Sequence, residues 1–210
     1  MNYQELQARV ALFANRNDLT EIIKDAINEA LDDFELSGRY KYMEARAAPT
    51  ITGIRYLAAP TRYLETISLT ATASGLKYFP AKNFEKFIWE NYPSTTTTGT
   101  PKLFAYLPDL AQLLIRPDPD VTYVWAHKYY QRSVAFSNPG DTNVLATNYP
   151  WILIYGTLLV LAPYLRDNDV VALWNAKFEK WKTILKESET HEEFAGSPLV
   201  VQPVYTEIVD

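Results

Sequence analysis

Apolar residues recur at helical spacing near both ends of the chain and change to strand-like alternation between them. Residues 3–14 fit a short helix with Leu6, Val10 and Phe13 on one side. A longer helix follows and runs to a plausible stop at Gly38, because its apolar positions recur at steps of three and four residues and share one face. Those positions are Leu19, Ile22, Ile23, Ala26, Ile27, Ala30, Leu31 and Phe34.

Acidic residues predict where two of the helices begin. Asp18 followed by Glu21 resembles a capping box, in which the Asp oxygen accepts a hydrogen bond from a helix amide and the Glu reaches back to the cap. Asp167 and Asp169 are predicted to cap the last helix, which extends to about residue 188. The apolar face of that helix is formed by Val170, Val171, Trp174, Phe178, Trp181 and Leu185.

The middle of the chain, between residues 40 and 130, is rich in β-branched and aromatic residues and is punctuated by Pro and Gly. Residues 63–70 alternate as one strand, whereas residues 83–92 fit a short helix. Residues 94–101 are predicted to be a surface loop, because consecutive threonines offer no apolar face and Gly99 and Pro101 would break a ladder. The threonines of this loop are Thr95, Thr96, Thr97 and Thr98.

Three further strands are predicted over residues 103–107, 110–115 and 121–130. They are separated by Pro108-Asp109 and by the turn at residues 117–120, and proline excludes the primed turn types. A type I turn with a bulge, or a slightly longer loop, is therefore expected. Such short connections predict an antiparallel meander of the three strands.

The C-terminal segment, residues 189–210, has no helical period and contains Gly196, Pro198 and Pro203. It is nevertheless too apolar for a purely solvated linker. Its alternating apolar residues could add a strand to a neighbour or fill surface pockets, so we expect a docking tail. The residues expected to contact a partner are Phe194, Leu199, Val200, Val201, Val204, Tyr205 and Ile208.

Together these elements predict an α+β protein with a mainly α-helical core, an inserted antiparallel β-rich middle and an extended C-terminal tail. Residues 1–188 are interpreted as a single domain, whose helical core comprises residues 1–38 and 148–188 and whose β-rich insertion comprises residues 39–147. Residues 189–210 form the tail. The 210 residues, 48% of them hydrophobic, suffice for one substantial core.

Composition narrows the possible functions. The chain has no cysteine, which excludes disulfides, thiolate metal sites and a Cys nucleophile and fits a reducing cytoplasm. The net charge of −5 disfavours tight nucleic-acid binding, which needs clustered Lys and Arg. The longest apolar run, residues 151–165, is shorter than the roughly 20 residues of a membrane-spanning helix, so a buried core helix is expected. The N-terminus shows no pattern of a secretory signal.

Motifs of catalysis are absent from the sequence. The closest two of the seven glycines, Gly38 and Gly53, are fifteen residues apart, which excludes the Walker loop and the GxGxxG fingerprint. Neither His127 nor His191 belongs to an HExxH motif, and no cofactor or metal is expected. Asp-Pro steps such as Asp118-Pro119 are usually turn residues rather than metal ligands. A hydrolase that uses two distant carboxylates is not excluded.

Aromatic residues favour contact over catalysis. His127 falls on the same strand face as Tyr123, Trp125 and Tyr129, which is typical of a partly buried ring that is hydrogen-bonded among aromatic neighbours. His191 lies in the tail beside two glutamates and is expected to be solvated. Aromatic residues make up 14% of the chain and could also form a surface for a glycan or another small ligand. A ligand- or glycan-binding module is therefore the alternative function.

Several short motifs, by their order and spacing, resemble those of a known protein family. The motifs are Arg39-Tyr40, Gly99-Thr100-Pro101, Phe104-Ala105-Tyr106, Leu114-Ile115-Arg116-Pro117-Asp118-Pro119-Asp120, Tyr123, Tyr129-Tyr130, Thr142-Asn143, Tyr149-Pro150, Leu153-Ile154-Tyr155-Gly156 and Ala162-Pro163-Tyr164-Leu165-Arg166-Asp167. In this order, between helical ends, they resemble the head-to-tail connector adaptors of tailed phages. The likeness extends to about Glu187 and does not include the tail.

The resemblance implies a virion protein of the phage neck that is made in the host cytoplasm and has no catalytic residues. It implies a homo-oligomeric ring, commonly twelve-fold, that joins the portal protein to tail or nozzle proteins. It also implies that DNA passes through the ring without specific binding. An acidic channel wall would suit that passage, since a strongly basic lumen would hold the genome by counterion release.

Overall fold

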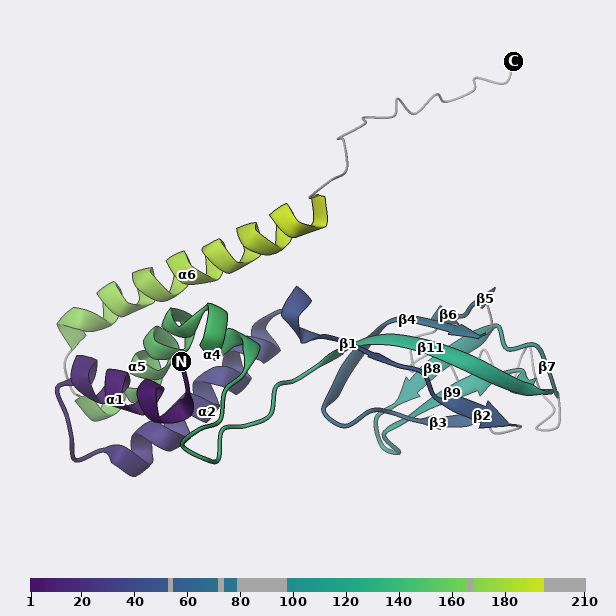
Figure 1. The fold of residues 1–210 in the computed structure, drawn as a ribbon, viewed down its shortest axis with the longest axis horizontal. Helices are drawn as coiled ribbons and strands as arrows, with labels where there is room; N and C mark the ends of the chain where they lie inside the picture. The colour runs from purple at the N-terminus through teal and green to yellow at the C-terminus, as the bar shows by residue number, and fades with distance from the viewer. Residues whose placement is uncertain (53–54, 72–73, 79–97, 166–167, 195–210) are drawn as a thin grey trace, which may run out of the picture. The chain divides into compact units, whose positions relative to one another are not determined.

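The computed structural model describes residues 1–52, 55–71, 74–78, 98–165 and 168–194. It shows an α+β fold, with helices at both ends of the chain and mainly antiparallel sheets between them (Figure 1). Contacts divide the chain into two compact units. The helical unit comprises Met1–Lys41 and Ala135–Asp210, and the β unit comprises Tyr42–Val134.

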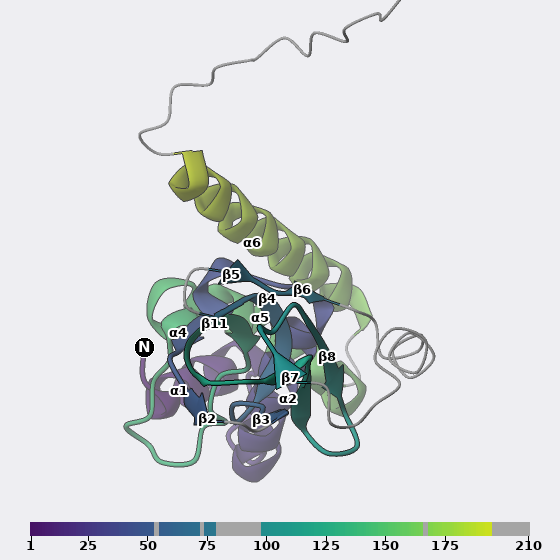
Figure 2. The ribbon, with the colours of Figure 1, turned by 90° about the vertical axis from the view of Figure 1, so that its right-hand side faces the viewer.

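The helical unit is built around the apolar helix α5, against which α1, α2, α4 and α6 pack. A helix that is apolar on all sides is stable only when its neighbours cover it, which explains its central position. The long helix α6 runs along one side of the unit (Figure 1 and Figure 2). The helices are α1 (Tyr3–Ala14), α2 (Thr20–Ser37), α4 (Val144–Asn148), α5 (Pro150–Leu165) and α6 (Asn168–Phe194).

The core of the helical unit consists of the predicted apolar faces. Its most deeply buried side chains include Leu6, Val10, Ile27, Leu31, Phe34, Leu153, Ile154, Leu158, Leu161 and Leu185. Gly156 of α5 allows close packing, because a Cβ there would lie 3.3 Å from the Phe178 ring and 3.4 Å from Ala30. Asn28 ties α2 to the segment before α4, since its side chain both donates to the Phe136 carbonyl and accepts from the Phe136 amide.

The N-terminus of α1 carries a capping box that was not predicted, although Asn2 and Glu5 have the spacing of this motif. The Asn2 side chain accepts from the Glu5 amide, and the Glu5 carboxylate accepts from the Asn2 amide. The capping box predicted at Asp18 and Glu21 is wrong. Leu19 is the N-cap of α2 and makes no side-chain cap, because its side chain has no hydrogen-bond acceptor. The Asp18 carboxylate instead accepts two hydrogen bonds from Arg16, each 2.7 Å long.

The last helix is longer than predicted. Its apolar face is confirmed, with Trp174 and Leu185 buried, but α6 continues to Phe194 and does not end near residue 188. The predicted tail therefore begins inside the helix. Glutamate is a good helix former, and a tertiary contact fixes the extra turns, since Glu189 accepts a hydrogen bond from the Lys41 amide at 2.7 Å. The spacing of apolar residues in the sequence cannot predict the end of a helix that a tertiary contact stabilises.

The β unit contains two main sheets with a shared core. One has the strand order β1-β11-β4-β5, with β2 also paired to β11, and the other has the order β3-β9-β8-β6. The strands of the first sheet are β1 (Glu44–Ala47), β2 (Thr50–Thr52), β4 (Tyr63–Ala71), β5 (Ser74–Gly75) and β11 (Thr122–Gln131). Those of the second are β3 (Tyr56–Ala58), β6 (Lys77–Tyr78), β8 (Leu103–Leu107) and β9 (Gln112–Arg116).

Strict alternation along β11 directs one face of this strand into the core between the sheets. Along β11, every second residue from Tyr123 to Tyr129 is buried, as the period of two predicts. Trp125 of β11 lies opposite Ala71 of β4, and Leu103 of β8 lies opposite Arg116 of β9. The core residues are Leu57, Leu69, Ala71, Phe104, Leu113, Ile115, Tyr123 and Trp125.

The predicted meander is only half correct. Strands β8 and β9 pair antiparallel around a turn in which the Ala111 amide donates to the Pro108 carbonyl at 3.4 Å and Ala111 has a φ of 49°. Strand β11, however, belongs to the other sheet. The intervening residues form the short strand β10 (Asp118–Pro119), which pairs with β7 (Thr98–Gly99), so β11 does not fold back onto β9. The expectation that Gly99 would break any ladder is therefore also wrong.

Some predictions fall outside the described residues. These are the short helix at residues 83–92, most of the threonine loop, Asp167 as a cap, and the tail beyond residue 194. In the described part of the chain, no helix combines the length and apolar character that crossing a bilayer requires.

Candidate functional site

His127 lies at the centre of an aromatic cluster inside the β unit. Its ring is 2% exposed, and its Nε2 atom is 2.8 Å from the hydroxyl oxygen of Thr66. The ring centroids of Tyr129 and Tyr63 lie 4.8 Å and 6.0 Å from it. Burial lowers the pKa of His127 to about 4, because an apolar surrounding disfavours the charged ring. The predicted position on an aromatic face is thus confirmed.

The pair of His127 and Thr66 is a weak candidate for nucleophilic catalysis. A catalytic base usually has a third group that orients it, and among the described residues no carboxylate is hydrogen-bonded to the other ring nitrogen. A base with a pKa of about 4 also accepts protons poorly at neutral pH. The Thr66 hydroxyl is further engaged with the Tyr63 hydroxyl at 2.9 Å. These contacts describe a hydrogen-bonded core.

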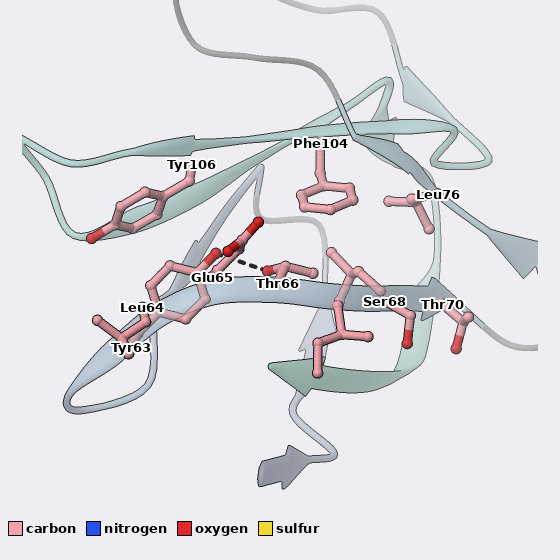
Figure 3. A pocket seen from close by; sticks show the side chains of 11 residues that line it. Tyr63, Leu64, Glu65, Thr66, Ser68, Thr70, Leu76, Phe104 and Tyr106 are labelled. Carbon is pink, nitrogen blue, oxygen red and sulfur yellow. Dashed lines mark hydrogen bonds between the residues drawn. The ribbon is translucent and has the colours of Figure 1, made fainter. Parts of the chain in front are cut away.

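A pocket of about 330 Å³ opens between β4 and β8 in the β unit. Figure 3 shows the rings of Phe104 and Tyr106 on β8 directed toward the side chains of β4. Tyr63 and Tyr106 have ring centroids 4.7 Å apart and form one wall. Such a cavity with aromatic walls and a few hydroxyl groups is the kind of site that a small polar ligand could occupy.

An ion cluster beside β10 explains the Asp-Pro-Asp motif. The Asp118 carboxylate is bound by Arg116 at 2.8 Å and by Arg55 at 3.0 Å, and the Asp118 and Arg116 residues are almost completely buried. Asp120 accepts a hydrogen bond from the Tyr123 hydroxyl at 2.7 Å instead. The two aspartates therefore stabilise a turn separately. Within the described ranges, no group of three or more metal-ligating side chains occurs.

The residues predicted to contact a partner are placed only in part. Phe194 is the last residue of α6, and Thr98 lies exposed in the short strand β7. His191, expected in a tail, lies in α6 as well. The other predicted contact residues lie outside the described residues: Thr95, Thr96, Thr97, Leu199, Val200, Val201, Val204, Tyr205 and Ile208.

The sequence pattern missed two features that the structure reveals. The pairing of Arg55 with Asp118 joins positions far apart in the chain, and no local signal indicates it. On α1, Leu12 is 71% exposed and Phe13 is 41% exposed, although Phe13 was assigned to the buried side of the helix. The sequence carried one signal that Leu12 is exposed, because this apolar residue lies outside the apolar face that was predicted for the helix.

Comparison with known proteins gives one match. The family model described as SU10 adaptor protein matches residues 1–202, and so includes both the helical unit and the β unit. A search of the curated proteins finds no match.

Proposed function

The chain belongs to the SU10 adaptor protein family, and from this premise we propose that it is a head-to-tail connector that joins the portal of a phage to its tail. Family membership implies a structural role as a phage adaptor, without catalysis, and suggests a component of the virion. The match over residues 1–202 is the observation that carries the proposal. The buried, neutral His127 and the paired Asp118 agree with it, because both act in packing.

In this proposal the copies form a ring, commonly twelve-fold, and DNA passes through its channel without specific binding. The net charge of −5 supports this part, because a wall with few clustered cations releases few counterions from DNA and does not hold it. The test is a reconstruction of the phage neck by electron cryomicroscopy. We expect an acidic channel wall, and a continuous lining of Lys and Arg would contradict the proposal.

The C-terminal tail is proposed to dock onto the portal. Because α6 reaches Phe194 and Glu189 contacts the Lys41 amide, a deletion that tests the tail must begin after residue 194. We expect the chain without residues 195–210 to keep its helical circular dichroism and thermal midpoint but to lose attachment to purified portal rings. Normal attachment by this shortened chain would place the docking site elsewhere, with the β unit as the first candidate.

A matched pair of variants separates apolar docking from mere tail length. Replacing Leu199, Val201 and Val204 with Ser removes the alternating apolar side chains and should weaken portal binding as strongly as the deletion does. Replacing Gln202 and Thr206 with Ser keeps the apolar residues and should leave binding unchanged. Equal binding by both variants would show that the apolar residues do not carry the contact.

The threonine loop is proposed as a second contact with a partner. Thr98 is exposed, while the parallel pairing of β7 with β10 fixes the end of the loop to Asp118 and Pro119. Replacing Thr95, Thr96 and Thr97 with Asp should weaken binding of portal or tail proteins without lowering the thermal midpoint. Unchanged binding to both would remove the loop from the proposed interface.

A second candidate function, binding of a glycan or another small ligand, is favoured by the pocket between β4 and β8. If it is correct, a panel of oligosaccharides should include one that raises the thermal midpoint in a saturable manner. Changing Tyr106 to Ala should abolish that rise, since its ring forms part of the wall beside Tyr63. If no oligosaccharide of the panel raises the thermal midpoint in a saturable manner, the second candidate function is refuted and only the adaptor function remains.

A further inference from the structure

A groove on the helical unit lies between α2, α5 and α6. It has a volume of about 490 Å³. Its apolar lining is formed by Ala30, Phe34, Gly156, Leu159, Val160, Pro163 and Phe178. The margin on α2 carries the carboxylates of Glu29 and Asp33, both exposed, and the margin on α6 carries Lys182. An apolar floor beside an acidic margin fits an amphipathic segment that has cations next to its apolar residues.

A stripe with this composition is exposed on α1 of the same unit. The α1 stripe consists of Arg9, Leu12 and Phe13, which share one side of the helix because they are three and four residues apart. Leu12 is 71% exposed and Phe13 is 41% exposed. Phe13 rests edge-on against Trp151 at 6.0 Å and against Tyr155 at 6.4 Å. Phe13 therefore stands on a packed aromatic base.

The stripe and the groove are complementary in charge. Arg9 would face carboxylates, while Leu12 and Phe13 would be removed from water, which is favourable for apolar surface. The C-terminal tail is a poorer occupant, because its charged residues, Glu207 and Asp210, have the same sign as the acidic margin.

The stripe and the groove lie on different sides of α5. Trp151 and Tyr155 meet α1, whereas Val160 and Pro163 line the groove. One copy therefore cannot fill its own groove with its own stripe. A contact between two unlike surfaces of identical chains is of the kind that generates rings. We propose that the α1 stripe of one copy packs into the α2–α5–α6 groove of the next copy. This proposal rests on the proposed function, which includes a ring, and it identifies the contact between neighbouring copies in that ring.

Cysteine cross-linking tests this contact directly, because the natural chain contains no cysteine. The full chain with both Leu12→Cys and Val160→Cys, oxidised at high protein concentration, should give a ladder of covalent dimers, trimers and larger species. Either single variant should give at most dimers. A control pair, Leu12→Cys with Lys177→Cys, places the second thiol on an exposed part of α6 outside the groove and should give no ladder. A ladder of equal strength from the control, or none from the first pair, overturns the proposal.

Charge reversal in the cross-linking background tests the pairing independently. Arg9→Glu should lower the yield of the ladder about fivefold, since an attraction near the surface becomes a repulsion. Adding Glu29→Arg to that chain should restore the yield. Adding Asp25→Arg, one helical turn away and outside the groove, should not restore it. Equal restoration by both changes would show that only overall charge matters and would refute the specific contact.

Binding to portal rings is measured separately with the unsubstituted chain. A chain that binds the portal and gives no ladder refutes the interface and leaves the adaptor function standing. A chain that gives the ladder and does not bind the portal refutes the adaptor function and leaves the interface standing. A ladder that is lost when residues 195–210 are deleted would assign the groove to the tail and would also overturn the proposal.

Discussion

At the scale of single residues, His127 and Asp118 show how burial determines what a polar side chain does in the β unit. His127 is almost completely enclosed and shares a hydrogen bond with Thr66. Asp118 is enclosed as well, but its carboxylate pairs with the guanidinium groups of Arg116 and Arg55. Both side chains therefore influence stability, and each influence can be measured.

The stability of the β unit should fall as His127 becomes protonated. The pKa of His127 is about 4 in the folded chain and about 6.5 in an unfolded one, so the unfolded chain binds the proton more readily. The loss begins as the pH drops below about 6.5 and grows toward 4. Between pH 7.5 and pH 4.5 it should reach about 2.5 kcal/mol.

Urea unfolding of the full chain at several pH values measures this loss. Carboxylates also titrate in the acidic range, so the comparison is with His127→Gln, which can still hydrogen-bond to Thr66. The variant should show a flatter dependence of unfolding free energy on pH. Identical slopes for the two proteins would contradict the assignment of the effect to His127.

Replacing Asp118 with Asn should destabilise the β unit strongly. The change leaves the guanidinium groups of Arg116 and Arg55 without their shared anion, and breaking a buried ion pair by removing one partner costs about 3 kcal/mol. Denaturant unfolding measures the loss. Asp109→Asn, which changes an exposed turn carboxylate, is the control and should have little effect. A similar effect of both changes would show that the cluster contributes no special stability.

At the scale of elements, the start of α1 depends on its capping box. Asn2→Ala removes the acceptor for the Glu5 amide and should lower the free energy of unfolding by about 1 kcal/mol. Asp18→Ala should have a smaller effect, because Asp18 caps no helix and forms an exposed pair with Arg16. Thermal unfolding of the two variants measures the difference. A larger loss from Asp18→Ala would show that Asp18 supports α2 in solution.

Strand β11 shows which properties of an element are local. Its extent and its buried face were predicted from alternation, because burial of one face of a sheet imposes a period of two. Its partners were not predicted. Short connections suggested β9, whereas β11 pairs with β1 and β4, which precede it by more than fifty residues. A sequence pattern describes the faces of a strand and not its neighbour in the sheet.

At the scale of the whole molecule, the β unit should fold without the helical unit. Its core is formed by its own residues, and its two ends lie side by side because Glu44 of β1 is opposite Tyr130 of β11. A chain of residues 42–134 should therefore show a cooperative thermal transition and dispersed amide resonances. Collapsed spectra without a transition would show that the β unit needs the helical unit in order to fold.

The sequence alone determined the helices at both ends, the β-rich middle and the aromatic face around His127, because these depend on short-range periods of apolar residues. Tertiary structure decided the end of α6 at Phe194 and the sheet that contains β11. It also decided which apolar residues of α1 remain exposed. Each of these depends on a contact between positions distant in the chain, and no local pattern encodes such a contact.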